Sequence, residues 1–150
     1  MHTVQLTLND SPIVLEFVKK LLIELAVRPE EETLGDTDKI LSDWKEAGNR
    51  FTAFAAYDGD KVVGVITLVE NFAIYAGGWY GIINELYIEP DYRSKGVGKT
   101  LLETVNEYGR RRGWKRIDVT APPGEAWERT VNFYKREGFV FTGPKLKVLL

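Results

Sequence analysis

The residues whose types and spacing most clearly indicate a chemical role form a glycine-rich turn at positions 93–98. The turn lies between a strand-like apolar segment and a helix-like one. A strand–turn–helix unit points several backbone N–H groups at one place, and a helix N-terminus carries about half a positive charge. The two glycines of the turn let an anion approach the backbone without an intervening Cβ. Arg93, Lys95 and Lys99 add mobile positive charge. We therefore expect this turn to bind a pyrophosphate.

Two nucleotide-binding motifs compete for the same turn. Gly98, Lys99 and Thr100 match the end of a P-loop, but that motif requires a glycine where Arg93 stands. The dinucleotide fingerprint G-x-G-x-x-G fails at Leu101, where its third glycine would lie, and it normally occupies the first βα turn of a chain. A P-loop nucleotide hydrolase is therefore kept as an alternative function.

The composition limits which catalytic groups are available. The 150 residues include no cysteine and a single histidine, His2, near the N-terminus. This excludes a disulfide framework, a thiolate zinc site and a cysteine nucleophile, and it argues against a Ser-His-Asp triad or a histidine-rich metal centre. An enzyme of this composition has to use carboxylates, Tyr, Lys, Arg, backbone amides or a cofactor, and we expect no metal.

Length and charge favour a soluble domain. A chain of 150 residues suits a single domain, here 1–150. The net charge of −2 lacks the basic excess that is typical of nucleic-acid binding. The first ten residues have no signal-peptide core, and the apolar stretches are interrupted by charged residues or glycine. We expect a cytoplasmic protein that contacts neither nucleic acid nor a membrane.

The elements that must position the turn follow from the hydrophobic pattern. Ser11 and Pro12 mark a helix start, Asp36 can cap a second helix, and the aromatic, glycine-rich residues 71–81 favour a loop. The pattern predicts strands at residues 4–8, 51–57, 61–69, 82–88, 116–120, 139–141 and 145–150, and helices at residues 12–25, 37–47, 97–112 and 125–137. This order predicts a mixed sheet with helices on both sides.

Two motifs carry a resemblance to a known family. Arg93-x-x-Gly96-x-Gly98 after residues 87–90 resembles the Q/R-x-x-G-x-G/A signature of the GCN5-related N-acetyltransferase (GNAT) superfamily. Residues 133–139, FYKREGF, resemble the family's F/L-Y-x-x-x-G-F element, and nearly the whole chain is covered. The resemblance implies the GNAT fold, an α+β domain with a mostly antiparallel central sheet. It also implies direct acetyl transfer from acetyl-CoA to a primary amine in a ternary complex.

The resemblance further implies which positions bind acetyl-CoA. The central strand would line pantetheine at Leu86, Tyr87 and Ile88. The turn and the helix start would hold the pyrophosphate at Arg93, Ser94, Lys95, Gly96, Val97, Gly98, Lys99 and Thr100. Many members place an asparagine seven residues before the helix tyrosine, where this chain has Trp127. Asn132 is the other asparagine candidate, although it points elsewhere on the helix.

Two side chains are candidates for acid–base chemistry. Glu85 shares a face of the predicted central strand with Ile83 and Tyr87, where burial would raise its pKa and let it deprotonate the amine. The alternative for Glu85 is a solvated or ion-paired carboxylate. Tyr134 would stay protonated and could supply a proton to the CoA thiolate, as the family motif implies, whereas its helical spacing alone favours a core residue. A non-catalytic acyl-CoA-binding module would need neither residue.

Three further features have more than one interpretation. The aromatic residues Phe72, Tyr75, Trp79 and Tyr80 could wall an acceptor pocket, contact a second copy in a homodimer, or pack within the fold. The basic residues 110–112 complement a helix dipole better than they indicate nucleic-acid binding. The acidic residues 30–32 and Asp36 would suit a cationic acceptor, or they form a solvated loop.

Overall fold

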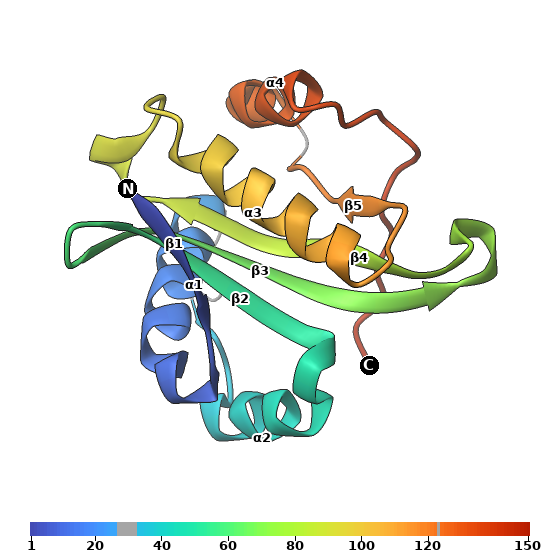
Figure 1. Ribbon diagram of the computed structural model, residues 1–150, viewed down its shortest axis with the longest axis horizontal. Coiled ribbons are helices and arrows are strands. Elements are labelled where there is room, and N and C mark those ends of the chain that lie inside the picture. Colours follow the sequence, from blue (N-terminus) through green and yellow to red (C-terminus); the bar gives the residue numbers. More distant parts are fainter. Residues whose placement is uncertain (27–32, 123) are drawn as a thin grey trace.

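The computed structural model describes residues 1–26, 33–122 and 124–150. Five strands form one sheet in the order β1-β2-β3-β4-β5: β1 His2–Leu6, β2 Phe51–Asp58, β3 Lys61–Ala73, β4 Gly78–Ile88 and β5 Ile117–Val119 (Figure 1). Antiparallel pairing joins β1 through β4, and β5 pairs parallel with β4. The predicted mixed, mostly antiparallel sheet is confirmed.

Helices cover both faces of this sheet, as Figure 1 shows: α1 Ser11–Leu25, α2 Thr37–Ala47, α3 Val97–Arg111 and α4 Glu128–Arg136. Val14 and Phe17 of α1 pack with the core on one face, and α3 and α4 contribute Leu101 and Tyr134, among others, to the core on the other. Within the described residues, no helix is both long enough and apolar enough to cross a membrane.

The helix starts follow the sequence signals with one adjustment. Pro12 lies in the first turn of α1, but Asp10 is the N-cap residue and Ser11 is buried inside the helix. The Asp36 carboxylate accepts the N–H of Lys39 at 3.1 Å and so caps α2. Both observations agree with the preference for short polar residues and proline at helix N-termini.

The prediction of a loop over residues 71–81 is wrong. β3 continues to Ala73 and β4 begins at Gly78, so that most of this segment is a long hairpin. Phe72 and Trp79 are register partners whose rings meet edge to face at 5.3 Å. Cross-strand aromatic pairs of this kind stabilise a sheet, and they outweigh the turn preference of the neighbouring glycines.

The strands predicted at residues 139–141 and 145–150 are also wrong. Neither segment forms a strand in the described part of the chain, and the side chains of Val148 and Leu149 are 80% and 84% exposed. An alternating pattern yields a strand only where a neighbour pairs with its backbone. β5, which ends the sheet, is only three residues long and offers little edge for pairing.

A buried ionic cluster holds the connection between α3 and β5. The Glu70 carboxylate, 9% exposed, accepts two bonds of 2.8 Å from Arg112 and one of 2.6 Å from the indole N–H of Trp114. The Trp114 ring fills the space beside Gly81, where a Cβ would lie 2.3 Å from it. Arg112 is thus a structural ion-pair partner and not merely a cation near a helix end. The cluster fixes where β5 begins beside β4.

We predict that Glu70→Ala lowers the free energy of unfolding by about 2–3 kcal/mol, because it leaves the Trp114 N–H and the Arg112 charge without their partner. The exposed Glu107, which lies 3.7 Å from Arg110, provides the matched control. Glu107→Ala should change stability by less than about 0.5 kcal/mol. Chemical denaturation measures both, and equal effects would contradict the role of the cluster.

Candidate functional site

The site is organised by a β-bulge in β4. Neighbouring residues of β3 pair with Ile83 and with Glu85, which leaves Asn84 as an extra residue. Ile83 packs in the core on the α3 face, whereas Asn84 and Glu85 both line a cavity on the α1 face. The prediction that Glu85 shares a face with Ile83 is therefore wrong. Tyr87 does lie on the same face as Glu85.

The bulge also marks the place where β4 and β5 separate. Their parallel pairing joins residues 81–83 to residues 117–119 and goes no further. In the described part of the chain, the edge of β4 over residues 84–88 has no strand partner on this side. Backbone groups on such an edge can hydrogen-bond an extended ligand. The three residues predicted to line pantetheine belong to this segment.

Thr67 on β3 orients the Glu85 carboxylate. The buried hydroxyl of Thr67 donates to Glu85 Oε1, and the backbone N–H of Glu85 donates to Thr67 Oγ1 at 3.1 Å. Burial raises the pKa of the Glu85 carboxyl, while the bond from Thr67 and the charge of Lys145 act in the opposite direction. The net direction agrees with the expectation from the sequence. Thr67 was not predicted, because a single threonine in a strand has no distinguishing motif.

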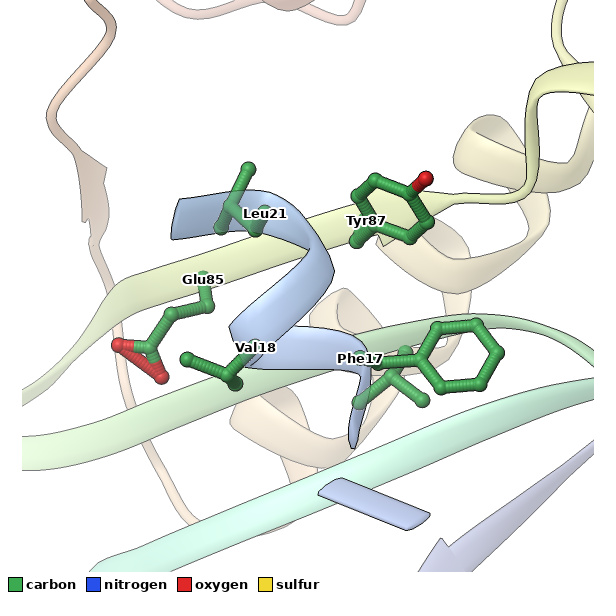
Figure 2. Close-up of a pocket in the computed structure, with 6 residues that line it drawn as sticks. Phe17, Val18, Leu21, Glu85 and Tyr87 are labelled. Atoms are coloured by element: carbon green, nitrogen blue, oxygen red, sulfur yellow. The ribbon is translucent and has the colours of Figure 1, made fainter. Parts of the chain in front are cut away.

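A cavity of about 260 Å³ lies between α1, α2 and β4 beside this carboxylate. Its lining includes Leu15 and Val18 of α1, Ile40 and Trp44 of α2, and Asn84 and Glu85 of β4. Figure 2 shows the adjoining pocket, where Val18 and Leu21 lie against β4 and the Glu85 carboxylate extends away from Tyr87. Glu85 is therefore reachable from an apolar space that is large enough for a small molecule.

The aromatic residues of the β3–β4 hairpin do not line this cavity. Tyr80 is buried, whereas Phe72, Tyr75 and Trp79 are exposed on the β3–β4 hairpin, away from the residues that line the cavity. The acidic residues 30–32 lie outside the described residues, and Asp36 caps α2.

The glycine-rich turn has the left-handed backbone angles that are common in anion-binding turns. Ser94 (φ 61°) and Gly96 (φ 85°) both adopt the left-handed conformation, which bends successive N–H groups toward a common side. Gly96 is the N-cap of α3 and offers no capping side chain, so the first-turn N–H groups are left for another acceptor. Lys95 and Lys99 are exposed beside the turn.

The side chain of Arg93 is held in place, so the expectation that its charge is mobile is wrong. Its guanidinium donates to both oxygens of Glu24 on α1, at 3.1 and 2.7 Å, and its Nε donates to the carbonyl oxygen of Ile88 at 2.9 Å. Lys20 and Glu89 form a second ion pair between the same two elements. Arg93 thus ties the end of β4 to α1.

The two sequence motifs contact each other. A Cβ on Gly98 would lie 3.0 Å from the Phe133 ring of α4, so this glycine permits the close packing of α3 and α4. Arg129, which the sequence did not single out, donates from the start of α4 to the Ser94 hydroxyl. The Thr100 hydroxyl donates to the Gly96 carbonyl oxygen at 3.0 Å. The helix that carries Tyr134 is therefore positioned by the turn.

Tyr134 is 6% exposed and packs against the rings of Phe133 and Phe139. Burial raises the pKa of its phenol. Its hydroxyl makes no hydrogen bond to another described residue. Every fully buried side-chain N or O atom among the described residues, by contrast, has a hydrogen-bond partner. The hydroxyl therefore reaches an accessible space. Asn132, on the same helix, is exposed.

The sequence matches a protein-family model and two curated proteins. The model of the acetyltransferase (GNAT) family matches residues 18–139. An uncharacterised N-acetyltransferase of Methanocaldococcus jannaschii is 33% identical over 57 residues, 38% of this chain and 24% of that protein. The aminoalkylphosphonate N-acetyltransferase of Salmonella typhimurium is 32% identical over 80 residues, 53% of this chain and 50% of that protein. The matched segments thus span a quarter and half of these two relatives.

The fold is also found in solved structures. A structure described as a predicted acetyltransferase from Clostridium acetobutylicum with acetyl-CoA superposes with a TM-score of 0.77. The superposition covers 99% of this chain and 95% of that one at 19% sequence identity. The shared fold confirms the predicted α+β architecture. Among the described residues, no group of three or more His, Asp and Glu side chains could hold a metal ion.

We predict that Glu85→Gln stabilises the protein at neutral pH, because a neutral amide replaces a buried charge and can still accept the Thr67 bond. A carboxyl whose pKa is raised by folding adds stability below the unfolded pKa, about 4.3 for glutamate, and this contribution is lost as pH rises through the folded value. The advantage of the variant in Tm should therefore be largest near neutral pH and shrink in acid.

The exposed Glu103 of α3 serves as the control for this comparison. Glu103→Gln should leave Tm nearly unchanged at neutral and at acidic pH. Differential scanning calorimetry measures the effect. A Glu85→Gln protein that unfolds at a lower temperature than the parent at neutral pH would contradict the prediction. It would show that the charged Glu85 carboxylate does not destabilise the folded protein.

Proposed function

The chain belongs to the acetyltransferase (GNAT) family, and from this membership we propose that it transfers the acetyl group of acetyl-CoA to a primary amine. One observation carries the proposal: the bulge at Asn84 places the Glu85 carboxylate beside the open edge of β4. A donor bound along that edge and an amine bound at Glu85 would meet there. Transfer is direct in this proposal, as the family resemblance implies, and the absence of cysteine excludes an acetyl-cysteine intermediate.

The open edge and the turn supply the groups that acetyl-CoA requires. The β4 edge at residues 86–88 would bind pantetheine through backbone groups. Residues 93–99, with Thr100 next to them, would hold the pyrophosphate through the N–H groups around Ser94 and Gly96 and the charges of the exposed lysines. Arg93 contributes by fixing the turn, and the exposed Asn132 on α4 is kept as a further contact.

The chemistry is assigned to two side chains on opposite sides of the sheet: Glu85 of β4 and Tyr134 of α4. Bound acetyl-CoA supplies the acetyl group and a thiolate leaving group. Glu85 takes a proton from the ammonium group of the acceptor on the oxygen that Thr67 does not bond, and its raised pKa brings it closer to that of the amine. The Tyr134 hydroxyl, which its raised pKa keeps protonated, donates a hydrogen bond to the sulfur and stabilises the negative charge of the leaving thiolate. The thiolate then takes up the second proton that the acceptor nitrogen loses as the amide forms.

The sheet argues against the P-loop hydrolase. A P-loop joins a strand to a helix within a parallel βαβ arrangement. Here the turn follows β4, whose pairing with β3 is antiparallel, and the parallel contact with β5 ends five residues before β4 does. The non-catalytic acyl-CoA-binding module is the second candidate. It differs from the enzyme by making Glu85 and Tyr134 dispensable.

We retain a cytoplasmic location and a homodimer as part of the proposal. The dimer is supported by the tip of the β3–β4 hairpin, where Phe72, Ile74, Tyr75 and Trp79 are 57%, 90%, 72% and 48% exposed. Adjacent exposed apolar side chains of this kind favour contact with another protein surface.

Removing either catalytic group should slow turnover without weakening the binding of acetyl-CoA. We predict that Glu85→Gln lowers kcat/KM by about 10²–10⁴-fold and that Tyr134→Phe lowers kcat by about 10²-fold, while the KM for acetyl-CoA stays nearly constant. Detection of CoA with a thiol reagent measures both, and the protein itself has no thiol to interfere. Unchanged turnover in both variants would refute the roles of Glu85 and Tyr134, though not the fold.

The turn can be tested with two glycines of equal conformation. Gly96 (φ 85°) and Gly113 (φ 82°) lie at opposite ends of α3, and a Cβ at either position meets no atom within 4 Å. Replacement by Ala should destabilise both by about 1–2 kcal/mol through the left-handed backbone. Only Gly96→Ala should weaken acetyl-CoA binding, by about tenfold or more, in isothermal titration calorimetry. Equal affinities would place the pyrophosphate elsewhere.

A further inference from the structure

The described lining of the cavity between α1, α2 and β4 is mostly apolar and contains one charged side chain. Among the described residues that line it, Glu85 is the sole charged side chain and Asn84 the sole other polar one. Apolar side chains of α1 and α2, among them Val18, Ile40 and Trp44, form the walls. An acceptor with one ammonium group finds its partner at Glu85. A second ammonium group would lose its water in this space without gaining a second carboxylate from the described lining.

The size of the cavity suits a small acceptor. Its volume of about 260 Å³ lies near the lower end of the range for small-molecule sites, about 300 Å³. The Trp44 indole meets the Phe51 ring edge to face at 4.9 Å, so that it forms a stiff wall. Such a wall suits a compact aliphatic or aromatic body.

An anionic group on the acceptor is disfavoured as well. No Lys or Arg side chain belongs to the described lining of the cavity. Lys145, whose charge acts on Glu85, lies exposed in the C-terminal segment and does not line the cavity. A carboxylate or phosphonate bound beside Glu85 would therefore be repelled by that carboxylate, and the described lining offers no Lys or Arg side chain in contact with it.

We propose that the acceptor is a monoamine with a compact apolar body, whose amino group binds Glu85 and whose body packs between Val18 and Trp44. This inference rests on the proposed acetyl transfer and adds the chemical class of the second substrate. It excludes polyamines, amino acids and aminophosphonates as preferred acceptors.

A pair of amines of equal length tests the proposal. Hexylamine and 1,5-diaminopentane have the same number of non-hydrogen atoms and differ only in whether the far end is a methyl or an ammonium group. We expect kcat/KM for hexylamine to exceed that for 1,5-diaminopentane by more than about tenfold, and 2-aminoethylphosphonate to be poorer still. CoA release in the presence of acetyl-CoA measures all three.

A carboxylate added to the wall should change this preference. Ile40 of α2 is 37% exposed and lines the cavity, so Ile40→Asp places a second negative charge there with little burial. The variant should gain at least about tenfold in its relative preference for 1,5-diaminopentane. Ile23 of α1 is 48% exposed and does not line the cavity, so Ile23→Asp should keep the ratio of the parent protein.

The outcomes separate the two proposals. If 1,5-diaminopentane or 2-aminoethylphosphonate is the better substrate of the parent protein, the apolar monoamine class is wrong while acetyl transfer stands. If none of the three amines releases CoA, calorimetry of amine binding tests the cavity by itself, and an absence of acetyl-CoA binding in the same instrument would count against acetyl transfer. Tighter binding of hexylamine than of 1,5-diaminopentane would support the assigned class, and equal or absent binding would overturn it.

Discussion

The site depends on the backbone hydrogen bonding of β4. This strand pairs with β3 along its whole length but with β5 only over residues 81–83, and the extra residue Asn84 lies at the point where the second pairing stops. The same bulge brings Asn84 and Glu85 to the α1 face, directly after Ile83 on the α3 face. One irregularity therefore opens an edge for an extended ligand and presents a carboxylate beside it.

The contacts around β4 keep this irregularity in place. At one end, Glu70, Arg112 and Trp114 hold the start of β5 against Gly81, so the two strands diverge from a fixed point. At the other end, Arg93 and Glu24 join the end of β4 to α1. These ionic contacts do not involve Glu85 or Tyr134, but they set the separation into which both substrates would fit. The buried Glu85 carboxylate, by contrast, opposes folding at neutral pH and is understandable as a functional group.

Much of this arrangement is predictable from the sequence, because capping residues and apolar periodicity are local signals. Pro12, Asp36 and the glycine-rich turn mark three helix starts correctly, and Glu85, a candidate buried base in the sequence, is half-buried in the central strand β4. The bulge is not predictable, since regular alternation describes the strand equally well until pairing with β3 is known. Thr67 and Arg129 escape notice for the same reason: their roles come from partners distant in sequence.

A crystal structure with acetyl-CoA bound tests the central claim most directly. The account predicts that the pantetheine chain hydrogen-bonds the β4 edge over residues 86–88, with the pyrophosphate on the turn at Ser94 and Gly96. Glu85 would lie on one side of the thioester and Tyr134 on the other. A ligand bound away from this edge, or a Tyr134 hydroxyl separated from the sulfur by the fold, would contradict it.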